Sequence, residues 1–408
     1  MKPFLYDAVM ADGNPPGNHF GGDGSFDGME MLNELMRMMG SPSTGVTESA
    51  RRLAHSIATD GQSEPNTDPT DRLGVEELVR VAELQLAAVT ELPTVGSVTR
   101  RVEVVNRSQW ADQTIADYRP IIETLSEAMT ANLPFDQDTD DDPITSMMAG
   151  FGNVMGPMML GMTMGSMIGS LARGSLGGFD LPVPRQPNAP LLVLLRNVDD
   201  FGEQWSLNPT DLRLWVCLHE VTSAAVLSVA HVRDRLTDLL LRHAAEFSPD
   251  LDRVMEQFGE LNLANQPDEF DRLQSTLNNP ELLLGAVRSP SQDALQPELT
   301  ALVAAVTGYV DWVMDTIGSN LISSYPMMTE ALRRQRVEAN AGDRFIERIL
   351  GLELDAAQYD RGAAFAAGVV ERAGRSGLHR LFEDAANLPT PAEVDAPGLW
   401  LARIDLPS

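Results

Sequence analysis

The stretch Leu214–Asp234, LWVCLHEVTSAAVLSVAHVRD, decides how the rest of the chain is interpreted. Its apolar residues predict a long helix, and Asn208 or Thr210 just before it can serve as the N-cap. The stretch also holds the chain's single cysteine, Cys217, in its most apolar part. One cysteine cannot form an internal disulfide, so we expect Cys217 to be a buried, reduced thiol.

Within this helix, His219-Glu220-Val221-Thr222-Ser223 matches the motif HExxH except at its last position. Residues four apart share one helix face, so the two histidines of the motif can bind one zinc ion. The glutamate between them acts as a general base on the metal's water. Because a catalytic zinc needs about three protein ligands and one open position, the replacement of the second histidine by Ser223 puts the site in question.

Composition excludes some function classes. The chain has 408 residues, of which 43% are hydrophobic, enough for a sizeable core. Its net charge of −29 disfavours binding to nucleic acid or to anionic lipid, both of which need a basic surface. The first residues contain no long apolar core of the kind found in a secretory signal, so we expect a cytoplasmic protein.

We predict a mainly α-helical protein with a few short strands. Residues 1–27 are rich in Gly, Asp, Asn and Pro and predict a disordered tail. Residues 28–408 predict a single domain with four parts: N-terminal helices (28–143), a buried Gly- and Met-rich helix (144–172), the motif helix region (208–246), and a second helix with a C-terminal unit (298–408). We place Pro297 just before that second helix, and short strands at Val102–Asn106 and Leu191–Asn197.

The segment 144–172 carries no charge and is long enough to span a bilayer. Pro157, the many glycines and the absence of flanking lysines argue against a span. Gly161, Gly165 and Gly169 lie four residues apart and would form a smooth groove along one helix face. We therefore favour a buried central helix that another helix approaches closely, with membrane insertion as the alternative.

The order and spacing of several motifs resemble a known family. Leu212–Leu236 is similar to the key helix of the zincin-like metallopeptidases found widely in actinobacteria, whose members are labelled zinc-dependent metalloproteases or hydrolases. That family has a Leu-Trp-Val-x-Leu-His-Glu-x-x-His run and a later Glu-Gly-(Trp, Tyr or His)-x-Asp-x-Val run, which Thr307–Val313 resembles. Leu350–Leu354 and Leu388–Thr390 resemble the family's tail. The resemblance extends from about Met29 to the end and implies a zincin-like helical domain.

The resemblance assigns roles residue by residue. His219 takes the place of the first metal ligand and Glu220 that of the general base. Ser223 takes the place of the second ligand, and Thr307 that of a glutamate that would be the third. Neutral hydroxyls are poor zinc ligands beside imidazole and carboxylate. Asp311, one turn beyond Thr307, could substitute as a ligand.

His231 is a second substitute considered for the missing ligand. It lies about 120° around an ideal helix from His219, so we do not expect it to share the site. With so few strong ligands left at the family's positions, we expect a protein without a cofactor. If a metal does bind, the resemblance implies zinc. A structural alternative keeps His219 and Glu220 as a satisfied buried polar pair, with Ser223 and Thr307 filling the former ligand space by hydrogen bonding.

Two functions follow from these observations. The first is a non-catalytic binding or scaffold protein that recognises a protein partner or peptide, with Glu220 silent at its family position. The second is an active metal-dependent peptide hydrolase that uses His219, Glu220 and Asp311. Neither involves nucleic acid. A third, less favoured hypothesis is a membrane-associated protein inserted through residues 144–172.

Overall fold

The computed structural model describes residues 42–92, 101–131, 160–187, 189–248, 289–337 and 341–406. These belong to one compact unit, Pro42–Ser408. The described chain is mainly helical with two short strands, as predicted. The predicted tail (1–27) lies outside the described residues, so the domain boundary at residue 28 stays a prediction.

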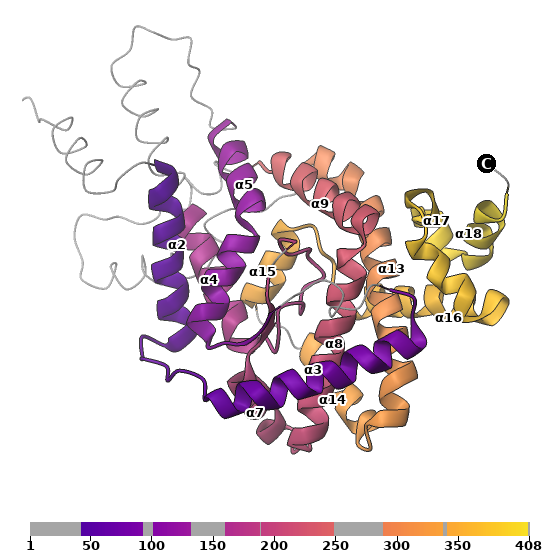
Figure 1. Ribbon diagram of the computed structural model, residues 1–408. Helices are drawn as coiled ribbons and strands as arrows, with labels where there is room; N and C mark the ends of the chain where they lie inside the picture. The colour runs from indigo at the N-terminus through magenta and orange to yellow at the C-terminus, as the bar shows by residue number, and fades with distance from the viewer. Residues whose placement is uncertain are drawn as a thin grey trace, which may run out of the picture. The chain divides into compact units, whose positions relative to one another are not determined.

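The elements follow one another along the chain as shown in Figure 1. In order they are α2 (Pro42–Thr59), α3 (Pro69–Val89), β1 (Val102–Val104), α4 (Arg107–Asp117), α5 (Arg119–Ala131), a helix over 160–174, β2 (Leu191–Val193), α7 (Leu195–Gln204), α8 (Pro209–Ser228), α9 (Ala230–Ala245), α13 (Pro290–Leu321), α14 (Tyr325–Val337), α15 (Ala341–Ile349), α16 (Ala356–His379), two 3₁₀ turns (Arg380–Phe382 and Ala385–Asn387), α17 (Pro391–Asp395) and α18 (Pro397–Ile404).

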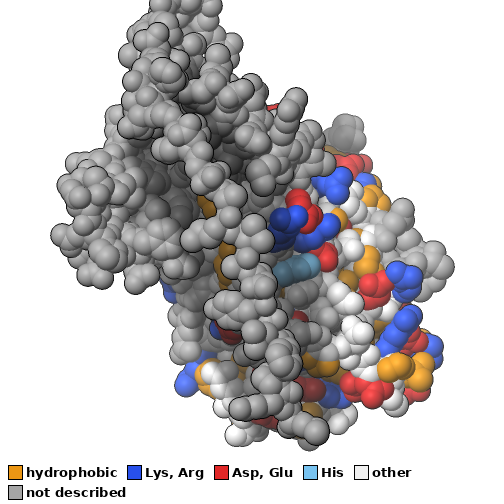
Figure 2. Space-filling view, turned by 90° about the vertical axis from the view of Figure 1, so that its left-hand side faces the viewer, with side chains coloured by type: hydrophobic (Ala, Val, Ile, Leu, Met, Phe, Trp, Pro, Cys, Tyr) orange, Lys and Arg blue, Asp and Glu red, His pale blue; other side chains and the backbone are white. Residues whose placement is uncertain are grey.

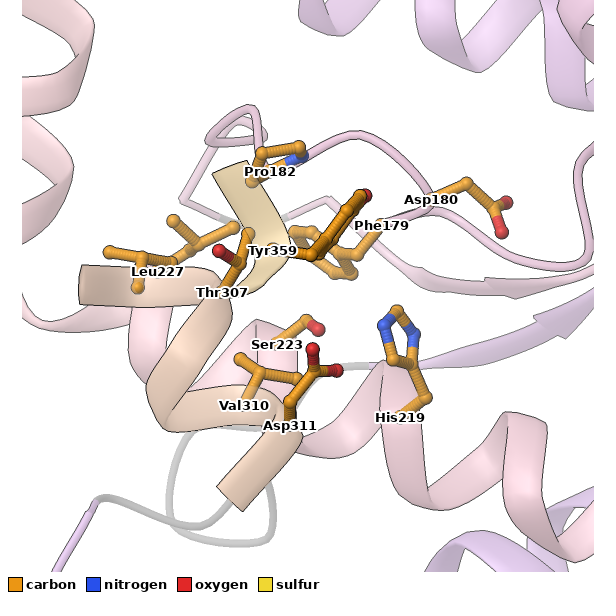
Figure 3. A pocket seen from close by; sticks show the side chains of 11 residues that line it. Phe179, Asp180, Pro182, His219, Ser223, Leu227, Thr307, Val310, Asp311 and Tyr359 are labelled. Carbon is orange, nitrogen blue, oxygen red and sulfur yellow. The ribbon is translucent and has the colours of Figure 1, made fainter. Parts of the chain in front are cut away.

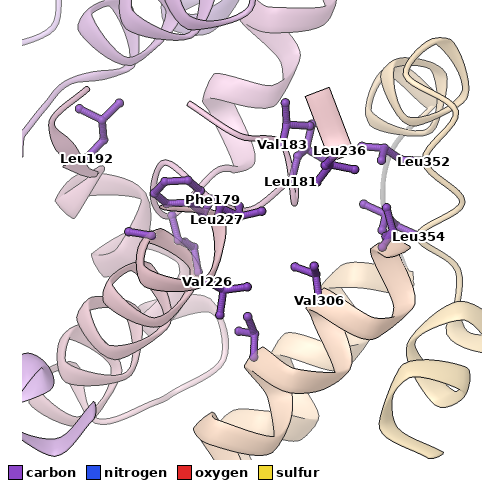
Figure 4. Packing of buried hydrophobic residues seen from close by; sticks show 14 of the residues in the cluster. Phe179, Leu181, Val183, Leu192, Val226, Leu227, Leu236, Val306, Leu352 and Leu354 are labelled. Carbon is purple, nitrogen blue, oxygen red and sulfur yellow. The ribbon is translucent and has the colours of Figure 1, made fainter. Parts of the chain in front are cut away.

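Helix α8 is the centre of the core. It begins after Asn208, whose side chain accepts hydrogen bonds from the backbone N–H groups of Thr210 and Asp211, so Asn208 is the cap. Helices α3, α7, α9 and α13 all pack on α8. A helix covered on several sides has no polar face, which explains its nearly continuous apolar sequence. Figure 4 shows Val226 and Leu227 of α8 together with Phe179 and Val306 in this core.

Helix α13 starts earlier than predicted. It begins at Pro290, and Pro297 lies inside it, so the predicted start at residue 298 is wrong. The first turns are held by a capping box between Ser289 and Gln292, and by bonds from the side chains of two glutamines to other segments. Gln292 Nε2 donates to the carbonyl of His243 (3.0 Å), and Gln296 Nε2 donates to that of Gly351 (2.7 Å). These tertiary contacts outweigh the interruption that a proline causes within a helix.

A two-stranded parallel sheet pairs Val102 with Leu191 and Val104 with Val193. Both predicted strands exist but are shorter than expected. The first ends at Val104 because Asn106 is already the N-cap of α4, and the second ends at Val193 because α7 begins at Leu195. Gly177 forms an antiparallel bridge with Val193. The sheet therefore anchors the segment that contains Gly177 beside α8.

The glycine-rich helix spans residues 160–174 of the described chain, and the part that falls in the predicted segment, 160–172, is mostly buried. A Cβ added at Gly165 would lie 2.5 Å from the carbonyl oxygen of Ala50, and one at Gly169 would lie 2.8 Å from that of Ala54. Helix α2 thus approaches the glycine face closely. Residues 144–159 lie outside the described part of the chain.

None of the described helices alone is both long and apolar enough to cross a membrane; only α8 and α9 taken together reach that length and apolarity, and they meet at an 85° bend.

Helices α13 and α16 also meet through glycine. A Cβ at Gly308 would lie 2.1 Å from the carbonyl oxygen of Gly362, and one at Gly362 would lie 2.4 Å from that of Ala304. Beyond this crossing the chain ends in α17 and α18. Trp400 is fully buried there and donates from Nε1 to the carbonyl of Asn387 (2.6 Å), so it anchors this end of the chain.

The described surface carries mixed charges. On the face in Figure 2, basic, acidic and apolar side chains are interspersed among the described residues.

Candidate functional site

A small cavity lies between α8, α13, α16 and the segment around Phe179. Its volume is about 30 Å³, room for roughly one or two water molecules or a small cationic group. Figure 3 shows the side chains that surround it. The lining residues are Phe179, Asp180, Pro182, His219, Ser223, Leu227, Val306, Thr307, Val310, Asp311 and Tyr359.

The structure brings together four of the residues singled out in the sequence. His219 and Ser223 project from successive turns of α8, and Thr307 and Asp311 from successive turns of α13; all four line this cavity. His231 lies elsewhere, with Nε2 at 3.3 Å from the carbonyl oxygen of Leu381. The helix break between α8 and α9 carries it away from His219.

Glu220 is placed differently from the other motif residues. It is 1% exposed and does not line the cavity. Its Oε2 accepts a hydrogen bond from the backbone N–H of Gly178 (2.7 Å), and its Oε1 accepts one from that of Phe179 (3.2 Å). The carboxylate therefore holds the loop beside α8.

Buried groups fix this loop from its other side. Arg185 donates from Nε to the carbonyl of Gly178 (2.6 Å) and from Nη1 to the carboxylate of Asp117 (2.8 Å). Both side chains of that ion pair are at most 1% exposed. The Arg185 guanidinium also lies 5.8 Å from the ring centroid of Trp110 and 5.9 Å from that of Phe179. The loop backbone is thus held by charged partners on both sides.

Two glycines make the close approach to Glu220 sterically feasible. A Cβ at Gly177 would lie 2.2 Å from Cδ of Glu220, and one at Gly178 would lie 3.3 Å from its Oε2. Side chains at these positions would push the carboxylate away from the amides. The absence of side chains at Gly177 and Gly178 is therefore what lets the Glu220 carboxylate reach the loop amides.

Asp180 stands at the edge of the cavity and stays accessible to solvent there. Its Oδ2 accepts hydrogen bonds from the backbone N–H groups of Leu176 and Gly177, both 3.0 Å. Desolvation by the surrounding protein and the negative charge of Glu220 raise the pKa of Asp180 to about 6, against the opposing effect of those two bonds.

Cys217 is fully buried, as predicted. Burial, with a further contribution from Glu220, raises the pKa of its thiol to about 12. The thiol is therefore protonated at neutral pH and does not act as a nucleophile.

The polar side chains that line the cavity differ in the partners that they contact. The His219 ring stacks on Trp215 at a centroid distance of 5.2 Å, and its Nδ1 lies 3.5 Å from Oε1 of Glu220. The Thr307 hydroxyl donates to the carbonyl of Val303 in its own helix (2.8 Å). Ser223 is 5% exposed, and its hydroxyl makes no hydrogen bond within the described residues. The expected hydrogen bonding across the former ligand space is thus not seen among these groups.

A second, larger cavity adjoins the first. Its volume is about 140 Å³, and Asp180, His219 and Tyr359 line both spaces. Most of the other lining is apolar and includes five leucines: Leu171, Leu176, Leu181, Leu332 and Leu354.

The donor set of the small cavity does not fit a catalytic zinc. Within the described ranges, no three His, Cys, Asp or Glu side chains are grouped to hold a metal ion. Of the carboxylates in the lining, that of Asp180 accepts hydrogen bonds from the backbone amides of Leu176 and Gly177, which leaves His219 and Asp311 as strong ligands. The two other ligand positions of the family, Ser223 and Thr307, are hydroxyls. The hydroxyl of Thr307 is already bonded within its helix. Two strong ligands fall short of the three that such a zinc requires.

Sequence reasoning missed the loop Gly177–Asp180 and Tyr359 as parts of the site. Only the adjacent pair Gly177-Gly178, followed by an aspartate, could have signalled a tight backbone contact. Which carboxylate would meet these amides depends on tertiary packing and is not visible in the sequence.

Comparisons with known proteins agree with this architecture. A family model described as zincin-like metallopeptidase matches residues 47–401. The crystal structure of a "putative hydrolase with a novel fold" from Chloroflexus aurantiacus is similar in fold, with a TM-score of 0.55 and 23% identity, over 88% of this chain and 99% of that one. A comparison with curated proteins finds no match. Because the family model covers most of its length, the chain belongs to the zincin-like metallopeptidase family.

Proposed function

We propose that this protein keeps the zincin-like fold without zinc peptidase chemistry, and acts as a non-catalytic binding or scaffold protein. The observation that carries this proposal is the placement of Glu220. At the position of the general base, its carboxylate is buried and accepts hydrogen bonds from the amides of Gly178 and Phe179. A base must reach the proton that it removes, directly or through one water.

The ligand positions support the same conclusion. Ser223 and Thr307 stand where the family resemblance places a histidine and a glutamate, so two metal ligands are lost on two separate helices. The helices still pack closely around the cavity.

One observation favours the alternative, a metal-dependent peptide hydrolase with a rearranged site. Asp311 and His219 line one cavity, and Figure 3 shows the carboxylate of Asp311 directed into it. This alternative requires Glu220 to leave its two backbone partners and turn toward the metal.

Metal analysis separates the two functions. Full-length protein purified without chelators, then incubated with zinc and desalted, should retain far less than one zinc per chain. The double variant Ser223→His with Thr307→Glu should retain about one. The matched double variant Ser223→Asn with Thr307→Gln adds similar bulk without strong ligands and should stay empty. One zinc per wild-type chain, with peptide hydrolysis that Glu220→Gln abolishes, would refute the proposal.

A further inference from the structure

We infer that the two adjoining cavities form a binding site for a primary alkylammonium group, such as a lysine side chain. The small cavity would take the ammonium head, and the larger cavity would take the alkyl stem. This inference rests on the proposed function, because a zinc ion at His219 would occupy the same space as the head.

The small cavity matches the hydrogen-bonding needs of an ammonium group, which has three donors and no acceptor. The Ser223 hydroxyl is nine-tenths buried, is directed into the cavity and lacks a partner among described residues, so it can accept one bond. The Asp311 carboxylate points into the same space and can accept a second. Nδ1 of His219 faces Glu220, so in the tautomer that carries its hydrogen on Nδ1 the Nε2 atom can accept the third bond.

The charge around the cavity also favours a cation. Asp180 and Asp311 both line it, whereas its lining contains no Lys or Arg. A volume of about 30 Å³ admits a compact ammonium, while the planar guanidinium of an arginine is larger. Tyr359 borders both cavities and can add a cation–π contact at their junction.

The larger cavity matches the stem. Five leucines form much of its wall, and its volume of about 140 Å³ suits a short aliphatic chain. A lysine side chain buries its methylenes along apolar surface while its head seeks polar partners. His219, Asp180 and Tyr359 line both cavities and so connect the acceptor cluster with the apolar wall.

The test uses n-butylammonium as the probe and full-length, metal-free protein, with binding followed by NMR titration of the His219 ring signals. We expect saturable binding of n-butylammonium and much weaker binding of 1-butanol, which has the same stem without the charge. Asp311→Asn should weaken binding about tenfold or more, and Ser223→Ala about fivefold. The matched control is Asp360→Asn, which removes one charge from an exposed position outside both cavities and should bind as wild type.

Equal binding of 1-butanol and n-butylammonium, or equal affinity of the Asp311→Asn and Asp360→Asn variants, would overturn the inference. Failure of the proposed function is seen separately, as stoichiometric zinc in the metal analysis. Two further ligands distinguish the natural source. Tighter binding of Nα-acetyl-lysine methylamide supports a peptide side chain, and tighter binding of cadaverine supports a free diamine.

Discussion

Replacing Glu220 tests whether this residue serves the fold or a reaction. Glu220→Ala removes two charge-assisted hydrogen bonds of 2.7 and 3.2 Å and leaves the amides of Gly178 and Phe179 in the interior. Each such bond contributes about 1.5–3 kcal/mol. Loss of the buried negative charge near Asp180 offsets part of this sum. We expect the free energy of unfolding to fall by about 3 kcal/mol.

The free energy of unfolding of Glu220→Gln should lie between those of Glu220→Ala and the wild-type protein. Its carbonyl can accept from one amide, but its NH₂ group then faces the other N–H, so one bond of about 1.5–3 kcal/mol is lost. The same change should lower the pKa of Asp180, because the Glu220 charge is one cause of its elevation. Carboxyl signals of Asp180 in a ¹³C NMR titration would show this.

The assay is urea denaturation of full-length protein at pH 7.5. Glu203→Ala, at an exposed position on α7, is the control and should stay within about 0.5 kcal/mol of wild type. A Glu220→Ala protein as stable as that control would refute the structural role. Glu220 would then be better explained as a catalytic group.

Three further predictions concern packing and pH. Gly308→Ala should lower the free energy of unfolding by about 2 kcal/mol, because the added Cβ would meet a backbone carbonyl. Its control is Gly74→Ala in the same denaturation series: an added Cβ there has nothing within 4 Å, so the free energy of unfolding should rise by up to about 1 kcal/mol. Asp180→Asn should stabilise the protein at pH 7.5 by less than about 1 kcal/mol after solvent screening, measured by its unfolding midpoint. Arg185→Met should lower the free energy of unfolding by about 3–5 kcal/mol in urea, since it leaves a carboxylate buried without its partner.

The sign of the Asp180 effect follows from its raised pKa. Between its ordinary pKa of 3.8 and the folded value of about 6, the folded protein holds more protons at this site than the unfolded chain. The contribution of Asp180 to the free energy of unfolding therefore increases as the pH falls through 6 and decreases as the pH rises through it. In Asp180→Asn this contribution to the pH profile should vanish. An unchanged profile between pH 4 and 7.5 would contradict the raised pKa.

Periodicity in the sequence was enough to predict α8 and most of α13, two of the helices that line the cavity. The apolar run of α8 and its cap at Asn208 are local signals, as is the glycine spacing of the helix over 160–174. Pro297 misled the prediction of α13, because the bonds that extend the helix past it come from His243 and Gly351, which are distant in sequence. A rule that considers only the residues next to a proline cannot predict such long-range contacts.

The site was predictable in part for the same reason. Spacing within each helix pairs His219 with Ser223 on α8 and Thr307 with Asp311 on α13, and the resemblance to the family predicted that these two faces meet in one site. The direction of the Glu220 side chain could not, since it depends on the loop that contains Gly178 reaching α8. That approach is fixed by Arg185 and Asp117, which are far from the motif.

Contacts outside the cavity hold in place the helices that enclose it. Glu220 holds a loop, and Gly308 lets α13 approach α16 closely. Changes at either position would strain the core, so both serve packing whatever the cavity binds. Ser223 and Thr307 project from helices into a small space and hold no other segment in place. The cavity could therefore exchange a metal for another cation without altering the helices that enclose it.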